Sequence, residues 1–220
     1  MLLKGGDVVR QNELESTSTN GNDGNSHITL FKHLIKNEGE VKAVTVEPDD
    51  VAVLQYTGGT TGVPKGAMLT HRNLIANAYQ IEEYFKASAD KPHVKSLLKI
   101  GEERVMAIIP YFHIFGMSVA MISSLKMGFE LVVLPNPRNI KEVIKTMHSK
   151  RPTLFPVVPR ILQVITEHPK ISVYDLSGSE TIISGGSALA PGLKTSFEQL
   201  LKSPGLIKQG YGLTETAPVA

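Results

Sequence analysis

The stretch Tyr56–Gly66 constrains this 220-residue chain more than any other feature. It reads YTGGTTGVPKG and combines four glycines, three threonines and one lysine. Glycines let the backbone approach a ligand closely and adopt positive φ, so that several N–H groups converge on one anion. Threonine hydroxyls and the ammonium group of Lys65 would add donors for phosphate oxygens. The stretch therefore predicts a loop that wraps a polyphosphate, in preference to an ordinary glycine-rich turn.

The end of this stretch does not fit the Walker-type loop of kinases and GTPases. That pattern requires Gly-Lys-Ser/Thr opening directly into a helix. Here Lys65 is followed by Gly66 and then by Ala67–Leu69, which predicts a short strand. A helix is expected only from His71, with Thr70 as its N-cap and apolar side chains at helical spacing after it. The loop is therefore expected to join two extended segments.

The composition excludes several classes of protein. Charges nearly balance at +2, so no basic stripe indicates nucleic acid, and 41% hydrophobic residues can form a sizeable core. The absence of cysteine excludes a disulfide framework and a thiolate zinc site. The least polar stretch, residues 108–125, contains proline, histidine, glycine and serine, and so predicts strand, loop and buried helix in place of a transmembrane span. We expect a cytoplasmic protein, with peripheral membrane contact left open.

Strands and helices alternate in the expected secondary structure. Strands are expected at 51–56, 105–109, 129–134, 154–158, 181–184 and 206–208. Helices are expected at 28–36, 71–85, 118–127, 139–150, 159–168 and 191–201, with Asn139 and Glu142 forming a capping box. This alternation predicts an α/β fold with a largely parallel sheet flanked by helices, in which ligands bind at the carboxyl ends of strands. Residues 1–26 are expected to form a mobile or linker-like segment and residues 27–220 the folded domain.

A second motif, Gly210-Tyr211-Gly212-Leu213-Thr214-Glu215, stands near the end of the sequence. Together with Tyr56–Gly66 and its continuation through Leu74, it resembles the signature of the adenylate-forming enzymes, in the same order. This superfamily includes acyl-CoA synthetases, luciferases and nonribosomal peptide adenylation domains. The segment Leu54–Gly59 looks most like the long-chain fatty acid–CoA ligase branch. The resemblance implies that residues 27–220 are an incomplete AMP-binding (adenylation) domain.

The resemblance implies ATP-dependent activation of a carboxylic acid and its transfer to coenzyme A. A carboxylate would attack the α-phosphorus of ATP and expel pyrophosphate, which requires in-line positioning and neutralisation of phosphate charge. The implied enzyme is an AMP-forming acid–thiol ligase of fatty acid and lipid metabolism, which uses Mg²⁺ and a long-chain fatty acid. Two alternatives stay open: a ligase for an aryl or medium-chain acid, and a non-catalytic nucleotide-binding remnant of the fold.

The resemblance also implies roles for three catalytic candidates. Lys65 would bind the β- and γ-phosphates, Thr214 the α-phosphate, and Glu215 would help to hold Mg²⁺. A hard cation that bridges phosphates needs only one or two carboxylates, so one glutamate is sufficient. The plainer alternative is that Thr214 caps a helix and Glu215 is an exposed acid in its first turn.

Further candidates would bind the nucleotide or the acid. The other nucleotide-binding candidates are Thr57, Gly58, Gly59, Thr60, Thr61, Gly62, Gly185, Gly186, Ser187, Gln209, Gly210, Tyr211 and Gly212. The candidates for contact with the acid are His113, Gly186 and Ala188. For Tyr211 and His113, ordinary roles as a core aromatic and a core histidine stay open.

The chain departs from the family pattern at its ends. It stops at Ala220, before the positions at which the family has a ribose-binding aspartate, a hinge and a small C-terminal domain with a catalytic lysine. Few residues precede the phosphate loop. We therefore expect a fragment of a longer enzyme, without the small domain, and little or no ligase activity from the chain alone.

Overall fold

The structure is a computed structural model that describes residues 43–57, 65–89, 99–203 and 206–220. The chain divides into two units, Met1–Thr45 and Val46–Ala220. The described fold is that of the second unit, because nearly all of the first lies outside these ranges. The segments expected at 1–26 and 28–36 and the interior of the phosphate loop also lie outside them, so these expectations remain predictions.

A parallel sheet forms the centre of the second unit. Within the described residues it has five strands in the order β4-β3-β5-β6-β7. Their bounds are Arg104–Ala107 for β3, Glu130–Val133 for β4, Leu154–Val157 for β5, Thr181–Ser184 for β6 and Ile207–Gln209 for β7. The order reverses direction between β3 and β5, as in doubly wound sheets. The predicted α/β fold with a largely parallel sheet is thus confirmed.

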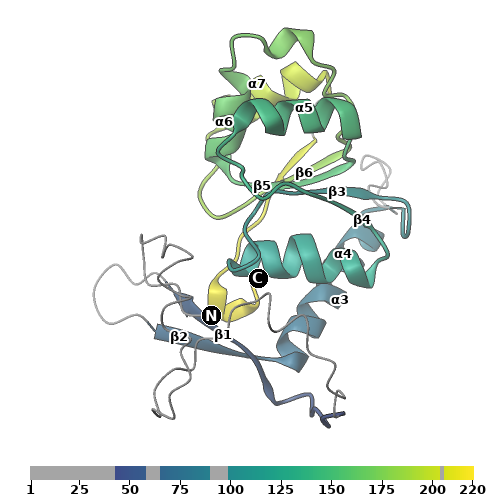
Figure 1. Cartoon of the computed structure of the whole chain (residues 1–220), viewed down its shortest axis with the longest axis vertical. Coiled ribbons are helices and arrows are strands. Elements are labelled where there is room, and N and C mark those ends of the chain that lie inside the picture. Colours follow the sequence, from purple (N-terminus) through teal and green to yellow (C-terminus); the bar gives the residue numbers. More distant parts are fainter. Residues whose placement is uncertain (1–42, 58–64, 90–98, 204–205) are drawn as a thin grey trace, which may run out of the picture. The chain divides into compact units, whose positions relative to one another are not determined.

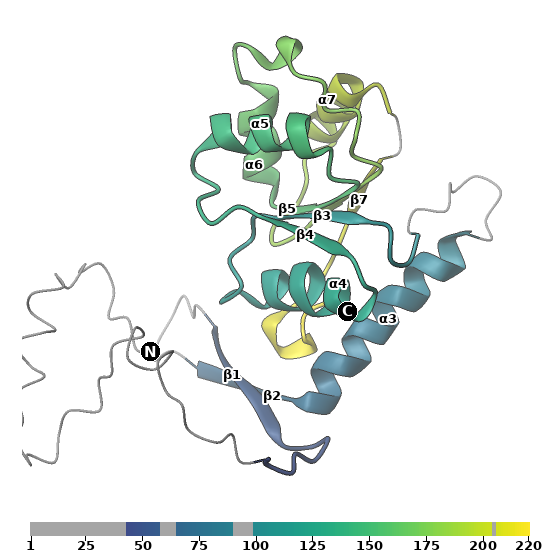
Figure 2. The same ribbon diagram turned by 45° about the vertical axis from the view of Figure 1, so that its right-hand side comes forward.

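Helices cover both faces of this sheet (Figures 1 and 2). On one face lie α5 (Ile140–Lys150), α6 (Pro159–Thr166) and α7 (Pro191–Leu201). On the other lie α3 (His71–Ala89), a π-helix (Gly116–Ile122) and α4 (Ser123–Lys126). The two layers bury strand β5 completely, which explains its continuous apolar sequence. In the part of the chain that the structure describes, no helix is long and apolar enough to span a bilayer.

A β-hairpin carries the two ends of the predicted phosphate loop. Strand β1 (Val51–Thr57) pairs antiparallel with β2 (Lys65–Thr70), so the residues that flank the loop lie opposite each other. Helix α3 begins directly after β2, and the backbone N–H of Asn73 donates to Oγ1 of Thr70 at 3.2 Å. The two expected extended segments and the expected N-cap are therefore confirmed.

The helix after the third strand differs from the α-helix expected at 118–127. A π-helix occupies Gly116–Ile122, and only Ser123–Lys126 is α-helical. Gly116 allows the backbone to pass close to the preceding loop, since a Cβ there would lie 2.5 Å from the carbonyl oxygen of Pro110. Apolar periodicity cannot distinguish such a widened turn from an α-helix. π-helical turns occur frequently at functional sites.

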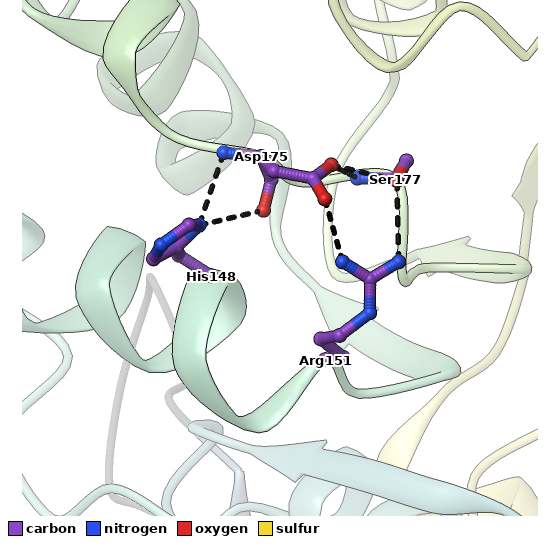
Figure 3. Close-up of polar contacts among 4 residues, drawn as sticks. All are labelled: His148, Arg151, Asp175 and Ser177. Carbon is purple, nitrogen blue, oxygen red and sulfur yellow. Dashed lines mark hydrogen bonds and ion pairs between the residues drawn. The ribbon is translucent and has the colours of Figure 1, made fainter.

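A polar network ties the segment before β6 to the end of α5 (Figure 3). Asp175 accepts hydrogen bonds from Ser177 Oγ at 2.6 Å, from the Ser177 backbone N–H at 3.0 Å and from Arg151 Nη1 at 2.6 Å. His148 Nδ1 accepts the backbone N–H of Asp175 at 3.1 Å. The hydrogen bonds from Ser177, followed by that from Arg151, hold the pKa of Asp175 well below its usual value.

We expect Asp175→Asn to lower the midpoint temperature of unfolding near neutral pH. A carboxyl group whose pKa is depressed by folding stabilises the protein above its unfolded pKa of about 3.9, and this stabilisation is lost as the pH falls towards the folded pKa. The difference between wild type and variant should therefore shrink below about pH 4. Thermal unfolding followed by circular dichroism over a pH series measures it. Glu180→Gln removes the same charge outside this network, and an equal effect of both variants would contradict the prediction.

Candidate functional site

A cleft of about 710 Å³ opens beyond the carboxyl ends of β3, β6 and β7. It is lined by residues that follow each of these strands, by one side of α3 and by the last residue of β1. This is the edge at which ligands bind in open α/β sheets. The cleft therefore lies where the sequence predicted a binding site.

The cleft brings together most of the predicted site residues. Those that line it are Thr57, His113, Gly185, Gly186, Gln209, Gly210, Tyr211, Gly212, Thr214 and Glu215. Lys65 lies opposite Thr57 in the hairpin with an exposed side chain and is not part of the lining. Ser187 and Ala188 are exposed and also lie outside the lining. Gly58, Gly59, Thr60, Thr61 and Gly62 lie outside the described residues, so their role stays a prediction.

The second motif forms a tight loop that closes on itself. The backbone N–H of Leu213 donates to the carbonyl oxygen of Pro218 at 2.9 Å. Gly212 pairs with Val219 in an isolated antiparallel bridge. A Cβ on Gly212 would overlap the carbonyl oxygen of Pro218, so only glycine allows the two chain segments to come this close.

This loop presents the motif side chains to the cleft. Thr214 and Glu215 begin a single 3₁₀ turn, Thr214–Thr216, whose N-cap is Leu213. Thr214 is therefore not the helix cap that the plainer alternative requires. Tyr211 is 70% exposed and lines the cleft, so it is not a core aromatic.

Two buried polar side chains attach the loop to the neighbouring helices. Ser118 of the π-helix donates from Oγ to the carbonyl oxygen of Ala217 at 2.8 Å. Asn77 of α3 donates from Nδ2 to the carbonyl oxygen of Val219 at 2.8 Å and to Oε1 of Gln80 at 3.2 Å. The position of the catalytic candidates thus depends on helices that are remote from the second motif in the sequence.

The glycine pair Gly185–Gly186 follows β6 directly, and the chain bends at Gly186. The backbone N–H of Gly185 donates to the carbonyl oxygen of Val157 at 3.1 Å, and a Cβ on Gly185 would lie 3.2 Å from the ring of Phe115. Gly186 has φ of 81°, a conformation that favours glycine. Both glycines line the cleft, and Gly186 is exposed.

The cleft has a polar and an apolar part. Thr57, Thr214 and Glu215 supply oxygen groups at the strand ends. The apolar lining beneath the sheet is formed by Ile81, Phe85, Phe115, Val119 and Ile183.

Sequence reasoning missed the part of α3 in this cleft. It assigned the apolar residues of the helix to the core alone, and it assigned no role to Gln80, Tyr84 or Lys208. The four-residue spacing of Gln80 and Tyr84 would place both on one side of a helix, and this was the available signal.

The cleft fits a magnesium ion only together with a phosphate ligand. Within the described ranges, no group of three or more His, Cys, Asp or Glu residues could hold a metal ion. Glu215 is exposed and lines the cleft next to Thr214. One carboxylate suits Mg²⁺ that is bound chiefly by phosphate oxygens and water.

The chain is similar to known proteins over most of its length. The profile of the family described as "AMP-binding enzyme" matches residues 3–220. A long-chain-fatty-acid–CoA ligase of Bacillus subtilis is 38% identical over 201 residues, which are 90% of this chain and 33% of that protein. The 4-coumarate–CoA ligase CCL1 of Humulus lupulus is 32% identical over 182 residues, which are 83% of this chain and 31% of that protein. The chain thus spans about a third of the length of these curated relatives.

Solved structures show the same fold. A long-chain-fatty-acid–CoA ligase from Archaeoglobus fulgidus superposes with a TM-score of 0.64 at 29% identity, over 82% of this chain and 35% of that chain. The inhibitor-bound N-terminal domain of FACL13 from Mycobacterium tuberculosis superposes with a TM-score of 0.65 at 24% identity, over 84% of this chain and 42% of that chain. The second similarity is a similarity of fold alone.

Proposed function

This chain belongs to the AMP-binding enzyme family. On that premise we propose that it functions in an AMP-forming acid–CoA ligase and that its cleft binds ATP and a carboxylic acid. One observation carries the proposal: a single cleft is lined by Thr57, near the start of the first motif, and by Thr214 and Glu215 of the second. These groups are separated by most of the domain in the sequence. Their meeting at the carboxyl edge of the sheet supports one shared ligand.

The proposed reaction has two steps. A carboxylate oxygen of the acid bonds to the α-phosphorus of ATP while the bond to the β-phosphate breaks, which releases pyrophosphate. The thiol of coenzyme A then takes the acyl group and AMP leaves. The hydroxyl of Thr214 would donate a hydrogen bond to the α-phosphate. Lys65 and the loop before it would bind the β- and γ-phosphates. Mg²⁺, held by Glu215 and the phosphates, would supply charge neutralisation when bound.

The nucleotide base is proposed to lie between Tyr211 and the glycine pair after β6. The exposed ring of Tyr211 lines the cleft and offers a flat face for stacking. Gly185 and Gly186 line the cleft from β6 and offer backbone without side chains. Gln209 lines the cleft immediately before the second motif.

His113 is proposed to contact the carboxylate of the acid. Its Nδ1 accepts the backbone N–H of Phe115 at 3.2 Å, which places the ring proton of neutral histidine on Nε2. Because His113 lines the cleft, this N–H is suited to donate to a carboxylate oxygen.

A long-chain fatty acid is the proposed acid. The apolar lining beneath the sheet suits a hydrocarbon chain, and the relative from Bacillus subtilis supports the same class. The second candidate is an aryl acid such as 4-coumarate, which the relative from Humulus lupulus supports.

ATP–pyrophosphate exchange by the protein that carries this domain tests the proposal. We expect exchange to depend on added hexadecanoate and to be weaker with 4-coumarate. The reverse order would favour the aryl acid. Binding of ATP without exchange with any acid would favour a non-catalytic nucleotide-binding module.

We expect Lys65→Ala to weaken ATP binding roughly 10- to 100-fold, because a hydrogen bond to a charged group contributes about 1.5–3 kcal/mol. Its exposed side chain makes little contribution to packing, so the unfolding temperature should change little. Isothermal titration calorimetry with ATP measures the affinity. Lys145→Ala is the matched control, since Lys145 is exposed on α5, across the sheet from α3. Unchanged ATP affinity in Lys65→Ala would show that Lys65 does not bind phosphate.

A further inference from the structure

We propose that Tyr84 and Lys208 close the outer end of the apolar part of the cleft and so limit the length of the acyl chain that it accepts. This inference rests on the proposed function. Both residues line the cleft, Tyr84 from α3 and Lys208 from β7. The Nζ of Lys208 lies 5.7 Å from the centroid of the Tyr84 ring, within the range of a cation–π contact. The pair therefore connects the helix to the sheet across the cleft.

The register of the sheet places Lys208 before the carboxyl end of β7, whereas the proposed phosphate-binding group Thr214 comes after it. Lys208 pairs with Ile183, and each stands one residue before the carboxyl end of its strand. Thr214, which is proposed to bind the α-phosphate, comes after the end of β7. An acid that reacts beside Thr214 would thus extend its chain back along Ile183 towards Lys208.

The apolar lining that α3 contributes extends from buried residues to Tyr84 at the surface. Ile81 and Phe85 are buried, whereas Tyr84 is 57% exposed and marks the solvent side of the cleft. The rings of Tyr84 and Phe85 meet edge to face with centroids 5.5 Å apart. Within the described residues the sheet order ends at β7. The opening between α3 and this edge strand is thus where a long acyl chain would emerge.

The chemical character of Tyr84 and Lys208 explains why the pair would limit the length of a bound hydrocarbon chain. Burial of methylene groups against apolar side chains makes binding more favourable. Displacement of water from an ammonium group by methylene groups brings no such benefit. Tyr84 is 57% exposed, so we expect its replacement to open the end without unfolding the domain. Chain-length preference should consequently change while nucleotide binding does not.

Calorimetric titration with octanoyl-, dodecanoyl- and hexadecanoyl-sulfamoyladenosine tests the proposal. These compounds mimic the acyl-adenylate and vary only the chain. We expect Tyr84→Ala to bind the hexadecanoyl compound about tenfold tighter than wild type, which corresponds to about two further buried methylenes. Binding of AMP and of the octanoyl compound should be unchanged. Tyr84→Phe keeps the ring and should keep the wild-type profile.

The possible outcomes separate this inference from the proposed function. Unchanged relative affinities in both Tyr84→Ala and Lys208→Ala would overturn the limit set by the pair. Failure of wild type to bind AMP or any acyl compound would overturn the proposed function, and the inference with it. Circular dichroism of each variant checks folding, and Lys208→Ala replaces Tyr84→Ala if the latter unfolds. A change shared equally by all three chain lengths would also contradict the limit.

Discussion

Replacement of Phe155 by alanine is expected to lower the free energy of unfolding by about 3–5 kcal/mol. Phe155 lies in β5, the central strand of the sheet, and has 0% exposure. It belongs to the main core cluster together with Phe197 of α7 and Leu162 of α6. Truncation removes buried apolar surface and leaves a cavity that a strand hydrogen-bonded on both sides cannot collapse to fill. Urea unfolding followed by circular dichroism measures the loss.

Val133→Ala is the control for this prediction. Val133 lies in the edge strand β4 with 53% exposure, so its truncation should change the free energy of unfolding by about 0.5 kcal/mol or less. Similar losses from both variants would show that the core is not centred on β5.

Gly212→Ala is expected to abolish most of the ATP binding and to destabilise the domain by about 1–3 kcal/mol. The new Cβ would overlap the carbonyl oxygen of Pro218, lie 2.9 Å from its carbonyl carbon and lie 3.3 Å from Cα of Val219. These are backbone atoms of the closed loop and cannot rotate away. The loop must therefore open and displace Thr214, and a loss of about 1.4 kcal/mol in binding is already tenfold in affinity.

Gly192→Ala is the matched control for this substitution. Gly192 lies in α7, and a Cβ there would meet nothing within 4 Å. Alanine at such a position should leave ATP binding unchanged and stabilise the domain by about 0.4–1 kcal/mol. Calorimetry with ATP and thermal unfolding compare the two variants. Wild-type affinity in Gly212→Ala would mean that the loop of the second motif does not bind the nucleotide.

The secondary structure could be predicted well where its signals are local. Asn139 was expected to cap a helix, and its Oδ1 accepts the backbone N–H of Glu142 at 3.3 Å. The Glu142 carboxylate accepts a bond from the side-chain amide of Asn139 at 3.2 Å, in place of the backbone bond of a capping box. Pro191 stands in the first turn of α7 as expected. Such signals lie within a few residues of the element that they define.

The packing of helices against the cleft could not be predicted in the same way. The π-helix begins at Gly116, which lies close to the Pro110 carbonyl, and apolar periodicity does not reveal this approach. The role of Tyr84 in the cleft depends on which side of α3 faces β7. Both follow from three-dimensional packing, in which residues of one helical stripe can line a cleft or fill a core.

The sequence by itself determined the α/β class and the two glycine-rich motifs, because caps, turns and periodicity are properties of short segments. Only the tertiary structure decided that Thr57 and Thr214 share one cleft and that α3 forms its wall. The hydrogen bond from Asn77 to Val219 shows the reason, since it joins residues 142 positions apart. Such contacts depend on the strand order and on helix packing, which the whole domain sets together.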